Sequence, residues 1–396
     1  MKIALIHNFF YRASGATELV LRAAVQLKKR GHAVSVYVLD AEDEVSAAFE
    51  REAIPVQSQG FREWRTNKTR FLSVLDPLLL LLNKLRALAV FWRLAGRIDR
   101  TADVLITSHY HLTPIIHILL AKPVIYYCHE PPRQYYEPLY GGGRAYRSLL
   151  WKLAHPLNAL YGLADKRLDR FCARKASVIL ANSDYTRRCV EKAYGRKAKT
   201  VSPGVDADVY RNLNLKRSYV LSVGRLYLDL KGHSFVIKSV GLLPKKKPAL
   251  VVVGDGTEGE KGRLRGIARE CGVPLEIKSG AGSGELVSLY NGAAVAAFGY
   301  VREPFGLTAL EAMACETPVV AVAEGGLQES VADAGVLTGR DERAFAEAIA
   351  GILASPEKAG RMGAAERRRV MEFFTWDGFG ARLEKVLSRF ATASTG

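Results

Sequence analysis

Short apolar runs alternate with amphipathic stretches from one end of the chain to the other. The runs are rich in Val, Ile and Tyr, whereas the stretches between them, such as 18–30, carry apolar residues at helical spacing. The pattern of the first half predicts strands at 2–7, 33–39, 104–109, 124–129 and 177–183. Continuous apolar strands separated by helices are typical of parallel sheets that are covered on both faces.

The same pattern restarts after the polar, turn-rich segment 202–211. It predicts further strands at 219–225, 249–256, 275–279, 294–300 and 318–326. Two such series predict an α/β fold of two doubly wound, Rossmann-like parallel-sheet domains, one over 1–203 and one over 204–375. The last helical stretch, 376–390, has no strand after it, so we expect 376–396 to pack back on the first domain.

The composition adds a strong positive charge to this picture. The 396 residues include 57 Lys and Arg against 40 Asp and Glu, for a net charge of +17. Such a field favours anionic partners, among them phosphorylated ligands, nucleic acid and anionic bilayers, without choosing between them. No two of the five cysteines are closer than 17 residues, which fits neither a disulfide framework nor a zinc site. We therefore expect a reducing, cytoplasmic environment, and the short apolar run at the N-terminus indicates a first strand rather than a secretion signal.

A leucine-rich segment at 71–97 leaves two interpretations open. Its apolar residues are interrupted by Asp76, Pro77, Lys84 and Arg86, so it is not a membrane-spanning helix. The leucines and Trp92, flanked by Lys and Arg, suit a helix that lies on an anionic bilayer. A core helix with a basic outer edge would have the same composition.

Two glutamates lie eight positions apart in "EPFGLTALEAMACETPVVA", residues 303–321, directly after a predicted strand. Pro304 disfavours a helical conformation at Glu303, whereas 305–314 has helical spacing. The amides of Phe305, Gly306, Leu307 and Thr308 would then be the unpaired donors of a helix N-terminus, which binds anions. Glu311 would lie further along the same helix, so both carboxylates could reach one elongated ligand. An acidic residue near a helix start also stabilises the helix without any ligand.

Cations and glycines follow other strands of the second series. Arg225 and Lys231, with Gly224 beside them, could hold a phosphate or be ordinary surface cations. The run "GDGTEG" at 254–259 has the spacing of a dinucleotide-binding turn, but the acidic residue that should follow is missing, so we expect a tight turn without NAD at Gly254. Lys278 ends the next strand, and the glycines at 325–326 could approach a sugar closely.

The first domain offers fewer candidates. Gly15 follows the first strand and could bring a backbone amide to the site. His129 and Glu130 follow a central strand, and the two prolines after them would display the pair on a rigid loop. Ligands of open α/β sheets bind outside the carboxyl ends of the strands, so we expect a site in the cleft between the two domains.

Together these motifs resemble the retaining glycosyltransferases of family 4, which have the two-domain GT-B fold. The similarity extends over nearly the whole chain, through "SGATE", "CHEPPR", "SVGRLYLDLKG", "VVVGDG", "EPFGLTALEAMACETPVVA" and "EGGLQESV". One departure is Glu316, which replaces the glycine that is frequent before Thr-Pro in this family. The resemblance implies a nucleotide-sugar donor and no obligatory metal.

The resemblance also implies roles for individual residues. Arg225 and Lys231 would neutralise the donor diphosphate, Glu311 would bind the ribose, and Glu303 would bind the transferred sugar. His129 would contact the sugar or acceptor and Gly15 the phosphate. The implied catalytic residues are His129, Glu303, Arg225 and Lys231. The implied donor-binding residues are Gly15, Gly224, Arg225, Lys231, Gly254, Lys278, Glu303, Phe305, Gly306, Leu307, Thr308 and Glu311.

The "YYCHEPPR" loop is similar to those of mannosyl- and related hexosyltransferases with lipid-linked acceptors, which favours GDP-mannose over UDP-sugars as the donor. A nucleotide-sugar epimerase of the same architecture remains an alternative. A hydrolase would also use paired carboxylates, but it has no role for the two cations. A nucleic-acid-binding protein would explain the charge, yet the chain has no aromatic-basic ladder or recognition motif.

Overall fold

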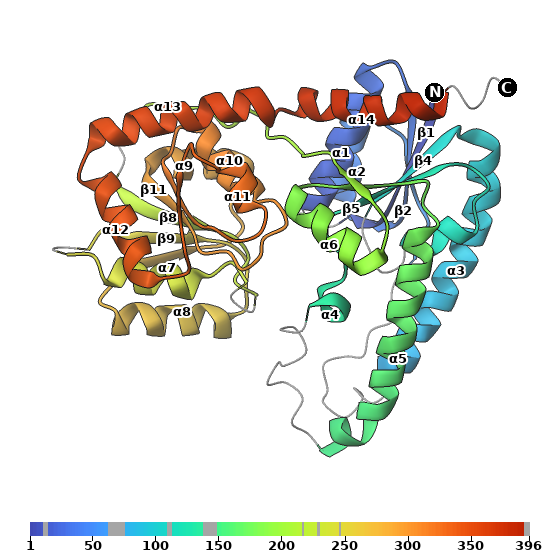
Figure 1. The fold of residues 1–396 in the computed structure, drawn as a ribbon, viewed down its shortest axis with the longest axis horizontal. Coiled ribbons are helices and arrows are strands. Elements are labelled where there is room, and N and C mark those ends of the chain that lie inside the picture. Colours follow the sequence, from blue (N-terminus) through green and yellow to red (C-terminus); the bar gives the residue numbers. More distant parts are fainter. Residues whose placement is uncertain are drawn as a thin grey trace. The chain divides into compact units, whose positions relative to one another are not determined.

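The computed structural model describes residues 1–10, 15–61, 76–108, 113–137, 149–215, 218–227, 230–244 and 247–391. The chain forms two compact units (Figure 1). Unit 1 comprises Met1–Val201 with Gly380–Gly396, and unit 2 comprises Ser202–Phe379. Each unit is an α/β layered structure built on one parallel sheet, which is the fold class that the alternating pattern predicts.

Unit 1 contains a seven-stranded sheet in the order β3-β2-β1-β4-β5-β6-β7. Its strands are β1 (Lys2–Phe10), β2 (Ala33–Ala41), β3 (Val56–Ser58), β4 (Val104–Ser108), β5 (Val124–Cys128), β6 (Val178–Ala181) and β7 (Ala198–Thr200). The helical elements are α1 (Gly15–Lys29), α2 (Asp43–Arg51), α3 (Asp76–Thr101), the 3-10 helix η2 (Thr113–Ile118), α4 (Arg133–Tyr136), α5 (Leu149–Arg174) and α6 (Asp184–Tyr194). The strand order reverses between β1 and β4, the point where doubly wound sheets bind ligands at their carboxyl edge.

Unit 2 contains a six-stranded sheet in the order β10-β9-β8-β11-β12-β13. Its strands are β8 (Tyr219–Val223), β9 (Leu250–Val253), β10 (Leu275–Lys278), β11 (Ala293–Phe298), β12 (Val319–Val322) and β13 (Val336–Thr338). Its helices are α7 (His233–Gly241), α8 (Glu258–Glu270), α9 (Ser283–Gly292), α10 (Leu307–Ala314), α11 (Leu327–Ser330), α12 (Glu342–Leu353) and α13 (Pro356–Phe373). The order reverses between β8 and β11, so the loops after these two strands are placed to bind a ligand together.

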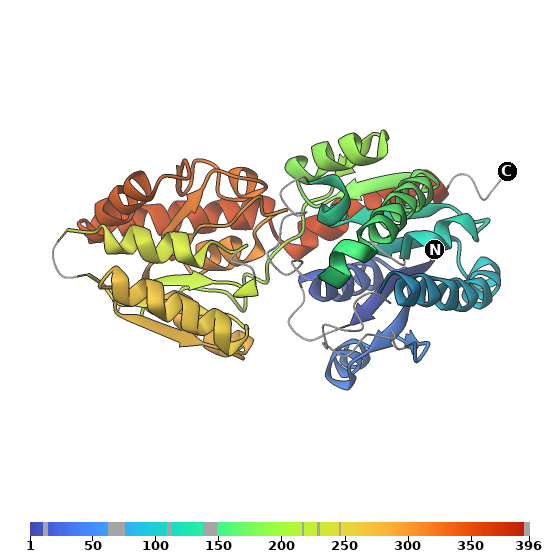
Figure 2. The same ribbon diagram turned by 90° about the horizontal axis from the view of Figure 1, so that it is seen from below.

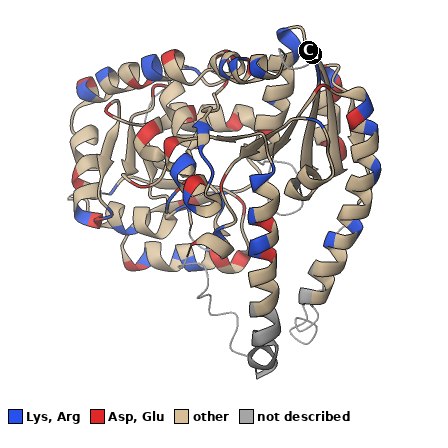
Figure 3. Cartoon of the chain, turned by 45° about the vertical axis from the view of Figure 1, so that its right-hand side comes forward, with Lys and Arg blue, Asp and Glu red and all other residues tan. Residues whose placement is uncertain are grey.

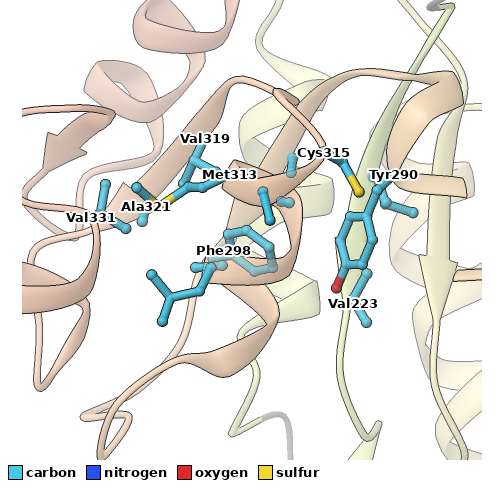
Figure 4. Close-up of a cluster of buried hydrophobic side chains, with 14 of the residues drawn as sticks. Val223, Tyr290, Phe298, Met313, Cys315, Val319, Ala321 and Val331 are labelled. Atoms are coloured by element: carbon cyan, nitrogen blue, oxygen red, sulfur yellow. The ribbon is translucent and has the colours of Figure 1, made fainter. Parts of the chain in front are cut away.

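Helices cover both faces of each sheet (Figure 2). In unit 2 the alternation along β9 shows how the core is divided. Val251 and Val253 belong to one buried cluster, whereas Leu250 and Val252 belong to the cluster on the opposite face. Figure 4 shows the first cluster, to which Phe298 of β11 and Met313 of α10 both belong. A strand whose sequence is continuously apolar is therefore buried on both faces of the sheet.

The last helix, α14 (Trp376–Ala391), begins in unit 2 and belongs to unit 1 from Gly380 onward. Glu384 of this helix pairs with Arg30 of unit 1, with 3.3 Å between Nε and the carboxylate oxygen. A Cβ added to Gly380 would lie 2.6 Å from the Arg30 guanidinium and 2.8 Å from Cβ of Gln26. The absence of a side chain at this position lets α14 lie directly against the end of α1.

Candidate active site

The loops after β8 and β11 bring a lysine and a glutamate together at the carboxyl edge of the unit 2 sheet. Nζ of Lys231 lies 2.7 Å from Oε2 of Glu303, and both side chains are largely shielded, with 23% and 19% of their surface exposed. Pro304 follows Glu303, and the helix begins only at Leu307, so Glu303 lies in the loop. The two expected ligands of the donor phosphates and sugar are therefore neighbours in space, although they are 72 positions apart.

Tyr300 lies beneath this pair and is a site residue that the sequence analysis missed. The Lys231 ammonium lies 4.3 Å from the centre of its ring, within the range of a cation–π contact. Its hydroxyl is shared between the carbonyl of Val223 and the hydroxyl of Thr308. Burial, and secondarily the nearby Glu303 carboxylate, raises the pKa of Tyr300 well above its usual value, so the phenol keeps its proton. Tyr300 thereby joins the ends of β8, β11 and α10.

Glycines allow the main chain to approach itself closely around Lys231. A Cβ on Gly254 would lie 2.0 Å from the carbonyl oxygen of Gly224, which excludes any side chain at 254. Gly224 has a φ of +143°, and its amide donates to Val253 at 2.8 Å. The amide of Gly254 in turn donates to the carbonyl of Lys278 at 2.9 Å. The "GDG" segment thus packs directly on the loop after β8.

The N-terminus of α10 is built from Gly306, Leu307 and Thr308. Gly306 is the N-cap residue, with a φ of +96°, and has no side chain with which to cap the helix. This left-handed conformation requires the glycine, and a Cβ there would also lie 2.7 Å from a terminal methyl of Leu327. Backbone amides at a helix start favour anions. The start of α10 comes shortly after Glu303 in the chain, and Glu303 contacts Lys231 in space.

The prediction that the amide of Phe305 belongs to the start of α10 is wrong. It precedes the N-cap residue, so its amide is not one of the first-turn donors of α10. Its ring is 3% exposed and packs edge-on against Phe374, with 5.7 Å between the centroids. The aromatic side chain therefore anchors the loop in the core, because the helix starts two residues later than the apolar spacing suggests.

Glu311 lies in the second turn of α10 and is half-buried. Its Oε2 accepts a hydrogen bond from the hydroxyl of Tyr290 at 2.8 Å. Both glutamates of the predicted pair thus belong to one short stretch of loop and helix, with Glu303 before the helix start and Glu311 beyond it.

The remaining candidates of unit 2 are less enclosed. Arg225 follows Gly224 and its side chain is exposed. The Lys278 ammonium lies 3.3 Å from Glu276 and 3.9 Å from Glu285, so its charge is directed to these carboxylates. Lys278 contacts the loop after β9 through its backbone carbonyl, which accepts from Gly254. Its ammonium is directed to carboxylates other than the Lys231–Glu303 pair.

In unit 1, His129 lies directly after β5 and is half-buried. Its Nε2 lies 2.7 Å from Oγ of Ser108 at the end of β4, and its ring packs edge-on against Tyr127. Its carbonyl accepts a hydrogen bond from the Asn182 amide after β6, at 3.0 Å. His129 is thus fixed at the carboxyl edge of the sheet, where ligands of such folds bind.

Gly15 is the first residue of α1 and exposed, and the four positions between it and β1, including Ser14, lie outside the described residues. His129 and Gly15 belong to unit 1, and Lys231 and Glu303 belong to unit 2. That these groups face one ligand across a cleft stays a prediction. Within the described ranges, no three His, Cys, Asp or Glu side chains are grouped so that they could hold a metal ion.

Two family models match consecutive parts of the chain. The model for "Glycosyltransferase Family 4" matches residues 13–209, and that for "Glycosyl transferases group 1" matches 209–369. A GDP-mannose-dependent alpha-(1-6)-phosphatidylinositol monomannoside mannosyltransferase of Mycolicibacterium smegmatis is 32% identical over 241 residues, 54% of this chain and 62% of that protein. A D-inositol 3-phosphate glycosyltransferase of Catenulispora acidiphila is 31% identical over 54% of this chain and 56% of its own length. The chain thus spans little more than half the length of these relatives.

Solved structures match the whole chain at lower identity. A sucrose-phosphate synthase from Thermosynechococcus elongatus superposes with a TM-score of 0.74 at 19% identity, over 99% of both chains. Anabaena HepE in complex with UDP and glucose gives 0.73 at 19% identity, over 98% of this chain and 100% of that one. These likenesses show the GT-B fold. With one family model on each half and this fold throughout, the chain belongs to the glycosyltransferases of group 1 and family 4.

Proposed function

We propose that this protein is a retaining glycosyltransferase that transfers a hexose from a nucleotide sugar to an acceptor hydroxyl. The observation that carries the proposal is the Lys231–Glu303 contact of 2.7 Å over the ring of Tyr300, with the N-cap residue Gly306 of α10 shortly after Glu303 in the chain. A cation, a carboxylate and helix-start amides at one edge of a sheet suit a ligand that joins a diphosphate to a sugar.

In this proposal the donor lies along the loops after β8 and β11 and the first turns of α10. Arg225 and Lys231 neutralise the diphosphate, and the amides of Leu307 and Thr308 bind phosphate oxygens. Glu311 accepts hydrogen bonds from the ribose hydroxyls. Glu303 orients the transferred sugar and shares Lys231 with the phosphate. For the residues of unit 1, the proposed roles are contact with the sugar or acceptor for His129 and contact with the phosphate for Gly15.

The chemical step breaks the bond between the anomeric carbon and the phosphate oxygen. The departing phosphate takes the proton of the acceptor hydroxyl, whose oxygen bonds to the same face of the sugar, so the configuration is retained. Negative charge grows on the leaving oxygen as this happens, and the fixed positive charges of Arg225 and Lys231 stabilise it most in the transition state. This stabilisation requires no divalent metal, and we propose that none is obligatory.

We propose mannose from GDP-mannose as the transferred group, and a lipid-linked or growing glycan of cell-envelope polysaccharide or glycolipid synthesis as the acceptor. The "YYCHEPPR" loop supports this choice, as does the GDP-mannose-dependent mannosyltransferase that is 32% identical to this chain. A UDP-sugar-dependent glucosyl- or N-acetylglucosaminyltransferase is the alternative.

The leucine-rich segment supports a location at a membrane. Its described part forms α3, and 71–75 lie outside the described residues. Within the described ranges no helix is both long and apolar enough to cross a bilayer. Large apolar side chains of α3 and of its neighbour α5 are nevertheless exposed, with Trp92 the most exposed at 69%; the others are Leu78, Leu81, Leu85, Leu160, Leu163 and Phe171.

Lysines and arginines lie along both of these helices (Figure 3). Exposed leucines beside cations suit contact with an anionic bilayer, so we propose that α3 and α5 bring the enzyme to the inner face of the plasma membrane. Co-sedimentation with anionic vesicles, lost on charge-preserving substitution of Leu81 and Leu85 by Ser, tests this part of the proposal. Binding that survives these substitutions would contradict it.

Thermal unfolding with GDP, UDP, ADP and their sugars tests the donor site. A nucleotide that binds only the folded state stabilises it by about 2.7 kcal/mol at 100 times its Kd, and we expect the largest shift with GDP and GDP-mannose. A radiolabelled sugar should then move to an acceptor glycan. Label that stays on the nucleotide would indicate an epimerase, and free sugar would indicate a hydrolase. Salt-sensitive DNA binding without nucleotide-sugar binding would contradict the whole proposal.

A further inference from the structure

The two loops that carry Lys231 and Glu303 touch through their main chains. A Cβ on Gly232, whose φ is +61°, would lie 1.8 Å from the carbonyl oxygen of Gly299. Beside this contact the amide of Val301 donates to the carbonyl of Leu230 at 3.0 Å. The separation of the lysine from the glutamate therefore depends on how these two stretches of backbone meet.

Arg340, directly after β13 and the glycine at 339, binds the main chain at that meeting point. Its guanidinium donates to the carbonyl of Gly299 at 3.0 Å and to that of Tyr300 at 2.6 Å. The remaining donors reach Glu324, at 2.7 Å and 3.0 Å from the two carboxylate oxygens. One planar group thus joins the loop after β11 to the loop after β12, which a lysine ammonium could not do with the same geometry.

Glu324 and the glycines after it hold the next part of the loop. The Glu324 carboxylate accepts a hydrogen bond from the backbone amide of Arg302 at 3.4 Å. The backbone amide of Gly326 donates to the carbonyl of Glu303 at 2.7 Å. A Cβ on Gly325 would lie 2.3 Å from that same carbonyl oxygen. The glycines at 325–326 therefore approach the backbone of the Glu303 loop, whereas the sequence suggested an approach to a sugar.

Strain in the loop explains why it needs such support. Arg302 has a φ of +48°, a left-handed conformation that costs a residue with a side chain about 1 kcal/mol or more. The hydrogen bond from Arg340, opposed in part by burial, lowers the pKa of Glu324, so this carboxylate stays charged at neutral pH and continues to accept. The strained residue lies between Tyr300 and Glu303, where a relaxed backbone would move the carboxylate.

We propose that Arg340 and Glu324 are positioning residues that hold Glu303, at its contact with Lys231, in the geometry needed for transfer. The proposal rests on the donor site proposed above. Their side chains are 31% and 30% exposed, and ion pairs this accessible contribute little to global stability. The effect of the pair lies in the geometry of the loop after β11, because Arg340 binds that loop through two main-chain carbonyls.

Steady-state kinetics of Arg340→Ala, Arg340→Lys and a control test the proposal. The control is Arg361→Ala, which removes an arginine of the same unit that pairs on an exposed helix surface with Glu357. We expect Arg340→Ala to lower kcat about 10- to 100-fold, with the nucleotide Kd changed by less than about threefold. Arg340→Lys should recover only part of the loss, and the control should behave as wild type. Equal kcat values for Arg340→Ala and the control would overturn the proposal.

A double-mutant cycle with Glu303→Gln separates positioning from a general effect on folding. If Arg340 acts through Glu303, Arg340→Ala should lower kcat by less than about threefold in the Glu303→Gln background. A full additional loss in that background would contradict the proposed route.

Hydrogen exchange gives a readout that does not depend on sugar transfer. The amides of Val301 and Arg302 should exchange at least tenfold faster in Arg340→Ala than in wild type, while those of β9 stay unchanged. Unchanged exchange at these two amides would overturn the positioning role. If the wild-type protein transfers no sugar, the function proposed above fails, and the exchange experiment still decides whether Arg340 holds the loop.

Discussion

The hydroxyl of Tyr290 donates a hydrogen bond to the carboxylate of Glu311 across 2.8 Å. Tyr290 is fully buried, and this burial, followed by the charge of Glu311, raises its pKa well above the usual value for tyrosine. The phenol therefore keeps its proton and remains a donor at neutral pH. This hydrogen bond fixes the Glu311 carboxylate from the core side of α10.

This contact leads to a prediction about nucleotide affinity. Glu311→Ala should weaken GDP binding about 10- to 100-fold, since a hydrogen bond to a charged group contributes about 1.5–3 kcal/mol. Tyr290→Phe should weaken it less, because the carboxylate remains and loses only its orientation. Isothermal titration calorimetry measures both. Glu303→Ala, in contrast, should lower turnover more than nucleotide affinity, and equal losses of both quantities in the two glutamate variants would refute the division of roles.

A second prediction concerns the positive charges that would face the diphosphate. Lys231→Ala and Arg225→Ala should each lower turnover by more than about a hundredfold, the usual effect of removing one stabilising group from the leaving oxygen. Lys238→Ala is a matched control, because this lysine is 50% exposed and pairs with Glu342 elsewhere in unit 2. Initial rates with saturating donor measure the effect. Near-wild-type rates for the Lys231 variant would remove the proposed role of the Lys231–Glu303 pair.

The sequence predicted every long apolar strand of both sheets, because strands buried on two faces carry an unbroken local signal. It did not predict β3, β7 and β13, three edge strands of three residues each. The stretches "VQS" and "AKT" have no apolar run, and they become strands only because a neighbouring strand offers its free edge. Tertiary pairing decides such elements, so local patterns miss them.

The same distinction separates the candidate residues. Glu303, Gly306 and Glu311 could be found from sequence because a proline, a glycine and helical spacing lie within one short stretch. Tyr300 and Arg340 could not, since their roles depend on contacts with loops that are distant along the chain. Phe305 was misassigned because the apolar spacing of a helix and the apolar anchor of the preceding loop look alike in sequence.

The close packing of the "GDG" turn predicts opposite effects for two glycine substitutions. Gly254→Ala places a methyl group 2.0 Å from the Gly224 carbonyl oxygen, so it should destabilise the fold by about 1–3 kcal/mol. Gly262→Ala, within α8 and with nothing inside 4 Å of its new Cβ, should stabilise it by up to about 1 kcal/mol. Urea unfolding at one pH compares them. Similar midpoints for the two variants would show that the turn yields without cost.

Glu316 offers a test of backbone strain, because it has a side chain in a left-handed conformation. Its φ of +55° is left-handed, and its carboxylate accepts a hydrogen bond from the side-chain amide Nδ2 of Asn212 at 2.9 Å. Glu316→Ala loses that bond and keeps the strain, whereas Glu316→Gly loses the bond and relieves the strain. The glycine variant should therefore be more stable than the alanine variant by about 1 kcal/mol. Urea midpoints in which alanine equals or exceeds glycine would contradict this account.

His117 of η2 makes unit 1 sensitive to acid. Nε2 lies 2.7 Å from the Thr107 hydroxyl, and Nδ1 lies 3.1 Å from the Cys172 carbonyl, so a neutral ring with its proton on Nδ1 satisfies both partners. Burial lowers the pKa of His117 to about 4, from an ordinary value of 6.5. Between these two values the unfolded chain binds a proton that the folded protein excludes. Stability from this group is therefore complete above pH 6.5 and is lost as the pH falls toward 4.

The loss should reach about 3 kcal/mol of unfolding free energy. His117→Gln keeps a side chain that can donate and accept but does not titrate, so its stability should fall less between pH 6.5 and pH 4 than that of the wild type. Burial raises the pKa of Asp169 to about 6, which acts in the opposite direction in both proteins and cancels in their difference. Urea unfolding across this range measures that difference. Parallel curves for the two proteins would mean that His117 takes up its proton without unfolding, which its two buried hydrogen bonds argue against.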